Sequence, residues 1–544
     1  MGLVALRPAN PRSARIATIE LGHCQARGGI AFTAFVRQIV RSTMSKQFYI
    51  TTAIDYVNGQ PHLGHAYEKI IADVIARAHR SLGDEVFFLT GLDEHGQKVQ
   101  QAALAEKKSP QVYCDELAAD WQAFAKKLEL TNDDFVRTTQ PRHKEFVQRI
   151  LSQLNDAGHF YKKAYSGFYS TKEETFLTEK DRLPDGKFDA SYGEVVELKE
   201  ENYYFKLGEQ QQWLIDYLEK NPSFVQPDYR RNEVLGFLKN NELEDLCISR
   251  PAARLNWGIS IPFDTNFVTY VWFDALVNYI SIPHAHPKLD LWPANVHVIG
   301  KDILKFHAVY WPIMLKAMNL PLPKQILVHG WWQKDGAKIS KSTGNVVDPI
   351  AVIDEWGLDA FRYYVLRELD IGPDGNWTDT GFRARYSAEL ANGLGNLVNR
   401  SLSMLKRYRD GIVPAKSNEL EAFAAKATDE TRALLKQNQL QAALQSIWSL
   451  VNRANKYVDE TAPFKLAKDP AQAKRLDEVL YNLAETCRVL AILLNPFLPG
   501  TSAKIFAQLG LTETPDKFSE AVWGKLNPGH KIGEPAPLFP RKDA

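Results

Sequence analysis

The sequence predicts an α/β fold, in which a parallel sheet is split by an inserted α+β segment and followed by a bundle of helices. Strand-like apolar runs alternate with helical patterns early in the chain, short aromatic and charged runs dominate its middle, and amphipathic helical patterns fill its final part. The 544 residues exceed what one hydrophobic core supports, so several domains are expected.

The sheet is expected to come from two separate parts of the chain. Residues 48–53 form a β-rich apolar run that ends in a turn, residues 67 to about 80 show apolar positions at helical spacing, and residues 86–90 form a second apolar run. Because strand, loop and helix alternate, the sheet should be parallel. Between 161 and 265 the pattern becomes that of an inserted α+β domain. Strand-like runs then resume at 266–272, 296–299 and 326–329.

Beyond about residue 386 the chain is expected to be nearly all helical. A bundle is the simplest way to bury the apolar faces of several amphipathic helices. The proline-containing stretch 495–500 should end the last long helix. The amphipathic patterns cover residues 390–409, 420–437, 441–459 and 471–494.

Composition excludes several classes of protein. Apolar residues make up 45% and charged residues 24%, as in ordinary globular proteins, and no apolar run approaches the roughly 18 residues of a membrane span. Lys plus Arg number 66 and Asp plus Glu 65, so only a local basic stripe could bind nucleic acid. The four cysteines, Cys24, Cys114, Cys247 and Cys487, are far apart, which argues against disulfides and a cysteine zinc knuckle.

Residues 1–43 form an unusual N-terminal extension. They contain several arginines, no lysine and a single acidic residue, Glu20, and strand-like sequence starts only after Met44. This composition fits an organelle transit peptide, and it also fits a disordered extension upstream of a natural start at Met44. The second interpretation is favoured, and the first stays open.

The first motif that carries chemistry is HLGH at 62–65, between an expected strand end and a helix start. An α/β sheet binds ligands at such a junction, and a helix N-terminus attracts phosphate. Two imidazoles there can donate hydrogen bonds to a triphosphate, and Gly64 lets a nucleotide approach the backbone. A helix cap or a chance metal pair would use the same residues, so the motif alone is not specific.

The second motif is KISKS at 338–342, after the strand expected at 326–329. Two lysines and two hydroxyls can stabilise the negative charge that develops on a pyrophosphate leaving group. No GxxxxGK sequence precedes this loop, so it is not a Walker A motif. Taken alone, it could equally be a solvated lysine loop.

Together the two motifs resemble the HIGH and KMSKS signatures of the class I aminoacyl-tRNA synthetases in order, spacing and strand context. The resemblance implies a Rossmann-like catalytic domain that uses ATP with Mg²⁺, forms an aminoacyl-adenylate and transfers the amino acid to the 3′ end of a tRNA. It implies catalytic roles for His62, His65, Lys338 and Lys341, and ATP binding by His62, Gly64, His65, Asp302, Lys338, Ser340, Lys341 and Ser342.

Further blocks resemble the methionyl-tRNA synthetases in particular: residues 54–58, 90–96, 270–276 and 300–307. This resemblance implies activation of L-methionine and its transfer to tRNA(Met), for initiation and elongation. Aromatic and aliphatic walls suit a flexible thioether, and one carboxylate suits the ammonium group. The implied methionine-binding residues are Ile54, Tyr56, Asp93, Trp272, Ala275, Tyr279, Ile303 and His307. Without the resemblance, Trp272 and Tyr279 would be interpreted as core residues.

The helical part is similar to the bundle with which this family reads the CAU anticodon, most clearly at residues 396–400. Asn396 and Arg400 lie four apart and share one helix face, and the resemblance implies that both contact anticodon bases. The family usually carries a tryptophan where Phe464 stands here, and a phenyl ring stacks on a base with less area. A solvated charged face is the alternative.

The resemblance also implies a domain order. Residues 1–43 would be the extension, 44–160 and 266–350 the two halves of the catalytic domain, 161–265 the inserted connective domain, 351–386 a stem-contact region, and 387–544 the anticodon-binding domain. Residues 169–174 lack the zinc-binding cysteines of many relatives, so the chain resembles the zinc-free branch, and no metal site or structural zinc is expected.

The expected partners are methionine and tRNA(Met), without a membrane. The chain is expected to be a monomer, since no appended C-terminal tRNA-binding domain follows the bundle, and to be cytoplasmic, or mitochondrial if 1–43 is a transit peptide. Two other classes of protein could carry parts of this pattern. A class I synthetase for isoleucine or cysteine would carry an editing insertion or zinc-binding cysteines. A non-catalytic paralogue would not need both signatures intact.

Overall fold

The computed structural model describes residues 46–57, 59–170, 175–177, 179–338 and 346–542. The predictions for the extension 1–43, for residues 171–174, and for Ser340, Lys341 and Ser342 therefore lie outside the described residues.

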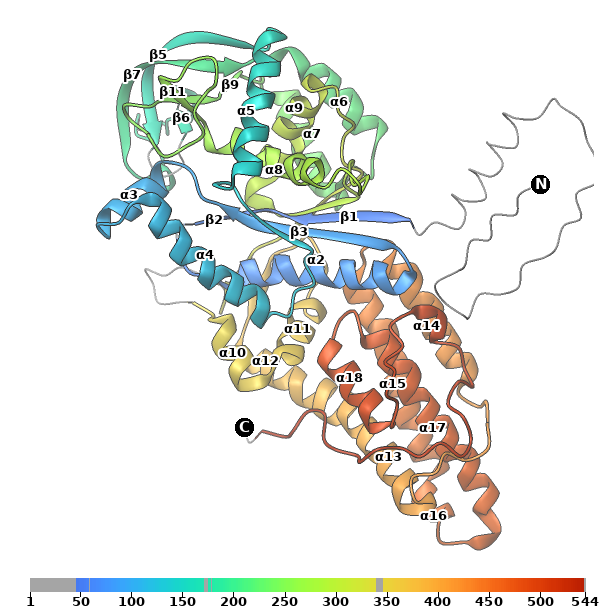
Figure 1. Cartoon of the computed structure of the whole chain (residues 1–544). Helices are drawn as coiled ribbons and strands as arrows, with labels where there is room; N and C mark the ends of the chain where they lie inside the picture. Colours follow the sequence, from blue (N-terminus) through green and yellow to red (C-terminus); the bar gives the residue numbers. More distant parts are fainter. Residues whose placement is uncertain (1–45, 58, 171–174, 178, 339–345, 543–544) are drawn as a thin grey trace, which may run out of the picture. The chain divides into compact units, whose positions relative to one another are not determined.

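A parallel sheet organises the first part of the described chain (Figure 1). Its strands follow the order β2-β3-β1-β12-β13-β8, with β4 paired to β3, and every pairing is parallel. The predicted parallel α/β fold is thus confirmed. The strands are β1 (Gln47–Thr52), β2 (Asp55–Tyr56), β3 (Glu85–Asp93), β4 (Asp134–Arg137), β8 (Val225–Gln226), β12 (Val296–Gly300) and β13 (Ile326–His329).

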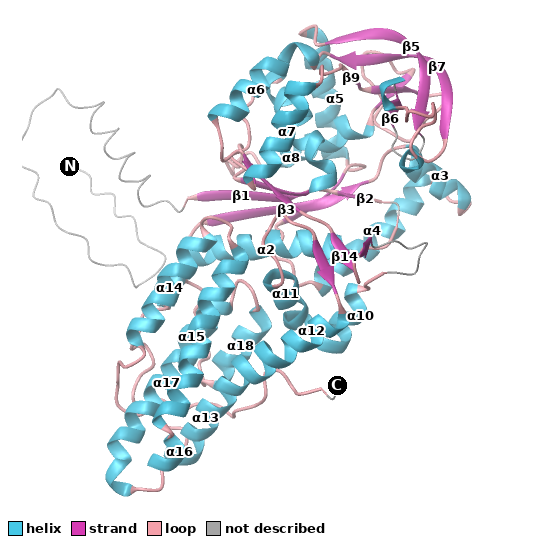
Figure 2. Cartoon of the chain, turned by 180° about the vertical axis from the view of Figure 1, so that it is seen from behind, coloured by secondary structure: helices cyan, strands magenta, loops and turns pink. Residues whose placement is uncertain are grey.

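Two apolar cores cover the two faces of this sheet. Val298 of β12 and Leu327 of β13 belong to the core that includes α2 (Leu63–Leu82). The neighbouring residues Ile299 and Val328 belong to the core on the other side. Successive strand residues point to opposite faces, so a sheet covered on both faces reads as continuous apolar runs. Figure 2 shows α2 along one side of β1 and β3.

Helix α2 begins earlier than the apolar spacing predicted. Its N-cap is His62, and His62 and His65 form a reciprocal capping box, so the motif itself starts the helix. The helix ends at Leu82 and is capped by Gly83, whose positive φ of 98° favours glycine. The motif histidines therefore stand at the N-terminus of a helix packed under the sheet.

The strand expected at 266–272 is wrong in its second half and in its partner. β11 (Phe267–Thr269) pairs antiparallel with β10 (Ser249–Pro251), outside the main sheet, and α8 (Val271–Ala285) begins two residues later. Almost every residue in the first three turns of α8 is buried. A fully buried apolar run has no polar face to reveal a helical period, so sequence cannot tell it from a strand.

The middle of the chain forms a smaller antiparallel sheet, in the order β6-β5-β7-β9. The range expected for the insertion also supplies β8 to the main sheet, where it pairs with β13. A strand of two residues is too short to show a period. The elements of this part are β5 (Phe160–Ser170), β6 (Thr175–Leu177), β7 (Val195–Phe205), α6 (Gln211–Lys220), α7 (Asp228–Asn240) and β9 (Leu246–Cys247).

Other elements surround these sheets or lead to the bundle. A third sheet has the order β15-β14-β16 and lies between β13 and the bundle in sequence. The remaining elements are α3 (Gln97–Ala105), α4 (Pro110–Lys127), α5 (Pro141–Asp156), α9 (Trp311–Ala317), β14 (Trp332–Lys334), β15 (Ala337–Lys338), α10 (Pro349–Trp356), α11 (Leu358–Arg367), β16 (Gly375–Trp377) and α12 (Asp379–Arg385).

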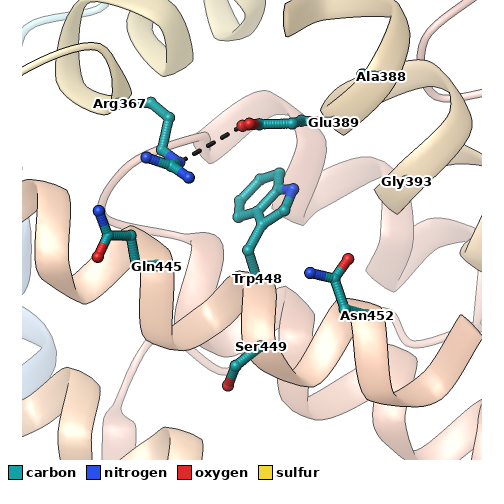
Figure 3. A pocket seen from close by; sticks show the side chains of 8 residues that line it. All are labelled: Arg367, Ala388, Glu389, Gly393, Gln445, Trp448, Ser449 and Asn452. Atoms are coloured by element: carbon teal, nitrogen blue, oxygen red, sulfur yellow. Dashed lines mark ion pairs between the residues drawn. The ribbon is translucent and has the colours of Figure 1, made fainter. Parts of the chain in front are cut away.

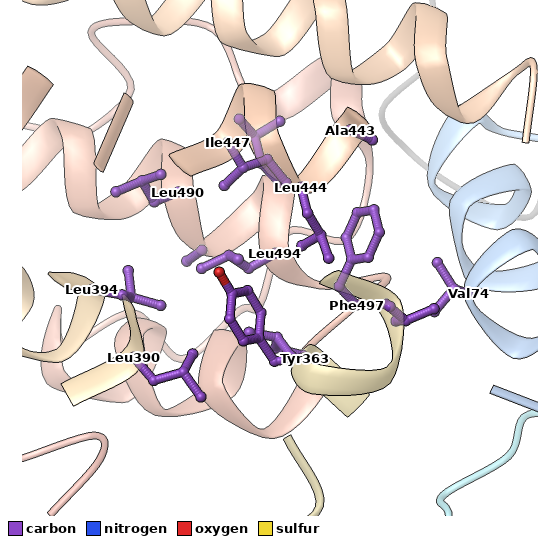
Figure 4. Packing of buried hydrophobic residues seen from close by; sticks show 14 of the residues in the cluster. Val74, Tyr363, Leu390, Leu394, Ala443, Leu444, Ile447, Leu490, Leu494 and Phe497 are labelled. Carbon is purple, nitrogen blue, oxygen red and sulfur yellow. The ribbon is translucent and has the colours of Figure 1, made fainter. Parts of the chain in front are cut away.

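The final part is helical, as predicted, and each expected helix is present with small shifts at its ends. Tyr363, Leu444, Leu490 and Leu494 pack together, and Val74 of α2 belongs to the same core (Figure 4). No helix of the described residues is long and apolar enough to cross a membrane. The elements are η7, a π-helix (Tyr386–Gly395), α13 (Asn396–Arg409), α14 (Glu421–Leu435), α15 (Leu440–Thr461), α16 (Pro463–Leu466), α17 (Ala473–Leu494) and α18 (Pro499–Gln508).

Candidate active site

A cavity of about 760 Å³ opens at the carboxyl ends of the strands of the main sheet. Its lining includes residues that end or directly follow four strands: Ile54 after β1, Asp93 at the end of β3, Asp302 after β12 and Trp331 after β13. A parallel α/β sheet binds ligands at this edge, where strand ends and helix N-termini leave a crevice.

Both motif histidines accept a backbone hydrogen bond through Nδ1. The N–H of Gly64 donates to His62 Nδ1 at 3.1 Å, and the N–H of His62 donates to His65 Nδ1 at 3.2 Å. A neutral imidazole that accepts at Nδ1 carries its proton on Nε2, so both rings are Nε2–H donors. The rings stack with centroids 3.7 Å apart, and both residues line the cavity. Two N–H donors at a helix N-terminus suit a phosphate group.

The absence of a side chain at Gly64 leaves room for the His62 ring. A Cβ at this position would lie 3.0 Å from His62 Cε1 and 3.2 Å from His62 Nδ1. Gly64 lines the cavity, as expected for a residue near a nucleotide. The steric requirement, however, comes from the folded-back histidine ring, which sequence reasoning did not foresee.

A buried ion pair lies next to the motif. Lys69 Nζ is 2.5 Å from Asp55 Oδ2, both side chains are almost fully buried, and His65 Nε2 is 3.9 Å from Asp55 Oδ1. Burial raises the pKa of Asp55 to about 7, although Lys69 opposes the shift. Asp55 also lines the cavity. Asp55 lies in the block 54–58, but no local pattern in the sequence indicated that Lys69 would pair with it.

A hydrogen-bonded pair, Tyr279 and His307, forms one polar part of the cavity wall. The Tyr279 hydroxyl lies 2.8 Å from His307 Nε2, and His307 Nδ1 lies 3.0 Å from the carbonyl oxygen of Ile303. Only a ring protonated at Nδ1 satisfies both contacts, so Tyr279 donates and Ile303 accepts. Burial lowers the pKa of His307 to about 4, which keeps this ring neutral at physiological pH.

Aromatic and aliphatic side chains form the rest of this wall. Trp272 and Phe306 stack with centroids 3.7 Å apart and 7° between their planes. Trp272, Ala275 and Tyr279 recur at helical spacing on α8, so they share one face. The cavity is lined by all of the residues predicted to bind methionine: Ile54, Tyr56, Asp93, Trp272, Ala275, Tyr279, Ile303 and His307.

Asp93 is the acidic residue predicted to meet the substrate ammonium. It is 6% exposed and lies opposite Tyr56 in the pairing of β2 with β3. A nearly buried carboxylate at a cavity wall offers a counter-charge to an ammonium group. Asp302, predicted on the nucleotide side, lines the same cavity.

The segments that flank the second motif converge on this cavity. Gln333 and Val346, on either side of 339–345, both line it. The backbone of Lys338, in β15, pairs antiparallel with Gln333 of β14. The described part of the second motif is thus joined to a strand that borders the cavity containing the first motif.

Several lining residues were missed by sequence reasoning. A general signal could have found two of them: Glu68 lies one turn after His65 on α2, and His329 ends β13 at the ligand-binding edge. Asp374 had no local signal, because it comes from the distant segment before β16. The missed residues include Glu68, Lys98, Asn278, Phe306, His329, Trp331, Gln333 and Asp374.

The residues predicted to read the anticodon lie in the bundle and do not line this cavity. Arg400 Nη2 is 3.5 Å from Asp459 Oδ1, which brings α13 beside the end of α15. Phe464 follows on α16 and is 44% exposed, while Asn396 starts α13. These positions are compatible with contacts to unstacked bases.

A second, smaller cavity of about 270 Å³ lies where α11 and η7 meet α15 (Figure 3). Arg367 forms an ion pair with Glu389 at its edge. Trp448 also lines this cavity, and its ring packs on Tyr363 with centroids 4.4 Å apart. In the described part of the chain, no group of three or more His, Cys, Asp or Glu side chains is arranged to hold a metal ion.

Two family models match the chain. "tRNA synthetases class I (M)" matches residues 48–198 and 184–402, and "Anticodon binding domain of methionyl tRNA ligase" matches residues 412–543. A methionine–tRNA ligase of Bacillus subtilis is 43% identical over 521 residues, which cover 91% of this chain and 78% of the relative. That of Caldanaerobacter subterraneus is 43% identical over 511 residues, which cover 92% and 80%.

Solved structures give the same result. The Mycobacterium tuberculosis methionyl-tRNA synthetase in complex with methionyl-adenylate aligns with a TM-score of 0.86 and 38% identity, covering 91% of this chain and 100% of that chain. Its apo form aligns with a TM-score of 0.80 and 36% identity, covering 92% and 99%. The chain therefore belongs to the methionyl-tRNA synthetases, the class I enzymes that activate methionine with ATP and join it to tRNA(Met).

Proposed function

We propose that the cavity of about 760 Å³ binds methionine and ATP side by side, and that its residues have the roles that the family resemblance implies for them. One observation carries the proposal: the predicted methionine-binding residues, both motif histidines and Asp302 line one continuous space. A relative aligned over the whole length of its chain was solved with methionyl-adenylate, the compound that would form in such a space.

In the first step the methionine carboxylate oxygen attacks the α-phosphorus of ATP, and pyrophosphate leaves. Asp93 holds the ammonium group, and the stacked Trp272 and Phe306 with Tyr279 enclose the thioether. The Nε2–H groups of His62 and His65 donate to phosphate oxygens. These preorganised donors stabilise the negative charge that develops on the phosphate oxygens in the transition state. No protein nucleophile is required, because the methionine carboxylate is itself the nucleophile.

Lys338 and Lys341 would stabilise the leaving pyrophosphate. Their motif begins in β15, beside Gln333 at the cavity wall. Mg²⁺ would arrive with ATP, because it binds phosphate oxygens and water and needs few protein ligands. In the second step the terminal hydroxyl of the tRNA attacks the adenylate carbonyl, and AMP leaves. Asn396, Arg400 and Phe464 would meanwhile contact the anticodon.

The remaining assignments are part of the same proposal. The domain boundaries are those expected from the sequence, with β8 returning to the main sheet from within 161–265. We infer a cytoplasmic monomer, which light scattering of the purified chain would test. A mass corresponding to two chains at micromolar concentration would contradict the monomer.

Methionine-dependent exchange of pyrophosphate into ATP, assayed with every amino acid in turn, tests the first step. We expect exchange with methionine alone. Lys341→Ala should slow single-turnover adenylate formation at least about a hundredfold while the Kd for methionine stays within about twofold. The matched control is Lys239→Ala, because Lys239 is an exposed lysine of α7 that pairs with Glu219. Unchanged adenylation by Lys341→Ala would refute the phosphate role of the second motif.

A further inference from the structure

Trp331 connects the nucleotide side of the cavity with the loop before β16. Its indole Nε1–H donates to Asp302 Oδ1 at 3.2 Å, and its backbone N–H donates to Asp374 Oδ1 at 2.9 Å. Lys301 completes the cluster, since its Nζ donates to Asp374 Oδ2 at 2.7 Å and lies 4.2 Å from the centre of the indole ring. One tryptophan is thus tied to two carboxylates from distant parts of the chain.

These contacts hold Trp331 in place although the residue is 39% exposed. The N–H of Gly375 donates to the carbonyl oxygen of Trp331 at 2.8 Å. The loop before β16 also packs tightly here, because a Cβ on Gly330 would lie 2.1 Å from the carbonyl oxygen of Pro373. The backbone hydrogen bonds fix the main chain of Trp331, and the Nε1–H bond to Asp302 together with Lys301 over the ring restrains the indole. The ring is therefore held in place by polar contacts although it is not buried. Packing of an apolar core does not account for such an arrangement.

The charge of Asp374 is maintained by its partners. Burial alone would raise the pKa of Asp374, but the hydrogen bonds from Lys301 and from the N–H of Trp331 lower it below its ordinary value. Asp374 is therefore an ionised acceptor near neutral pH. Its two oxygens bind one ammonium group and one backbone N–H, so it acts on the position of Trp331.

Asp302 depends on a partner to fix its carboxylate. It lies in a short 3-10 helix (Lys301–Ile303) directly after β12 and is exposed, so packing does not restrain its side chain. Its Oδ1 accepts from Trp331 and lies over Gly300, where a Cβ would be only 2.6 Å from that oxygen. Among the described residues, Oδ2 of Asp302 has no hydrogen-bond partner. A carboxylate oxygen oriented in this way can accept a hydrogen bond from a hydroxyl group.

We propose that Trp331 is a positioning residue for ATP: its indole N–H fixes the carboxylate of Asp302 so that the second oxygen accepts a hydrogen bond from a ribose hydroxyl. The inference rests on the proposed ATP-binding role of Asp302. Lys301 and Asp374 hold the tryptophan and do not touch the nucleotide in this arrangement.

Trp331→Phe tests the hydrogen bond while it keeps an aromatic ring for Lys301 to face. In methionine-dependent exchange the KM for ATP should rise about five- to tenfold, and the KM for methionine should stay within about twofold. Trp523→Phe is the matched control, because Trp523 Nε1 donates to the carbonyl oxygen of Ser417 at 2.8 Å in the helical part of the chain. This control should leave both KM values unchanged.

Nucleotide analogues distinguish positioning from general damage. One of the two analogues, 2′-deoxy-ATP or 3′-deoxy-ATP, lacks the hydroxyl that donates to Asp302. With that analogue Trp331→Phe should no longer raise the nucleotide KM, and with the other analogue the rise should persist. An equal effect on ATP and both analogues, or no effect on ATP, overturns the proposal.

Asp302→Ala separates this inference from the assignment on which it rests. If Asp302→Ala leaves the KM for ATP unchanged, the nucleotide role of Asp302 fails, and the inference fails with it. If Asp302→Ala raises the KM for ATP but Trp331→Phe does not, the role of Asp302 stands and that of Trp331 fails.

Discussion

Arg362 of α11 joins three distant segments of the chain, and its removal should destabilise the protein strongly. Its side chain is fully buried, and Nη2 lies 2.8 Å from Oδ2 of Asp73, which is also fully buried. Nε donates to the carbonyl oxygen of Phe497 at 2.8 Å, Nη2 to that of Pro496 at 3.1 Å, and Nη1 to that of Leu128 at 3.4 Å. The guanidinium thus satisfies the carbonyl groups that follow two helix ends, α17 and α4.

Arg362→Met keeps the apolar stem and removes the donors. Three buried carbonyl groups then lose a hydrogen bond, and among the described residues Asp73 keeps Arg77 and Thr131 as partners. Burial alone would raise the pKa of Asp73, but its partners lower this pKa, and the charge of Arg362 contributes most to the lowering. The ionised form of Asp73 therefore depends on Arg362. Removing one member of a buried ion pair costs about 3–5 kcal/mol.

Differential scanning fluorimetry with Arg77→Met as the control measures this effect. Arg77 also contacts Asp73, at 2.8 Å, but its side chain is 17% exposed, so its loss should cost about 1 kcal/mol. The melting temperature should fall by about 3–5 °C for Arg362→Met and by about 1 °C for Arg77→Met. Equal shifts for the two variants, or an unchanged melting temperature for Arg362→Met, would refute the reasoning.

Three further predictions follow from the site and the bundle. Because burial lowers the pKa of His307 to about 4, the unfolded chain binds its proton first as pH falls. Between pH 7 and pH 5 the wild type should therefore lose about 2 kcal/mol more stability than His307→Gln, and parallel urea-unfolding profiles would contradict this. Arg400→Ala should lower the kcat/KM for tRNA charging at least about tenfold and spare pyrophosphate exchange. Lys426→Ala, on an exposed lysine of α14, is its control, and equal losses in both assays would count against an anticodon role. Elemental analysis should find less than about 0.1 zinc per chain, since 169–174 lacks cysteine, and about one zinc would reject the prediction.

The position of the site could be predicted from sequence because its signals are local. HLGH lies where an apolar strand gives way to a helix, and that junction is the ligand-binding edge of a parallel sheet. The methionine-binding candidates were named from short blocks at strand ends and on α8, and those blocks meet in one cavity. The resemblance of those blocks to the methionyl-tRNA synthetases supplied the candidates, and the structure places Trp272, Ala275 and Tyr279 on one face of α8.

Contacts between side chains that are distant in the sequence could not be predicted from the sequence. The spacing of 14 positions between Asp55 and Lys69 spans a turn and part of a helix, and no periodic pattern indicates that they form an ion pair. The contacts of Trp331 with Asp374, and of Arg362 with Asp73, join residues of different elements, so only the folded chain brings them together. Likewise the first three turns of α8 are almost fully buried, so no polar face reveals a helical period, and the sequence pattern did not distinguish this apolar run from a strand.

The amino-acid sequence by itself indicated the family, most of the order of the elements and the methionine-binding candidates, because each of these depends on short contiguous blocks. The tertiary structure alone decided which charged groups lose their water and pair with one another. Burial depends on the packing of the whole chain, and that packing sets the pKa of His307, the partners of Arg362 and the fixed orientation of Trp331.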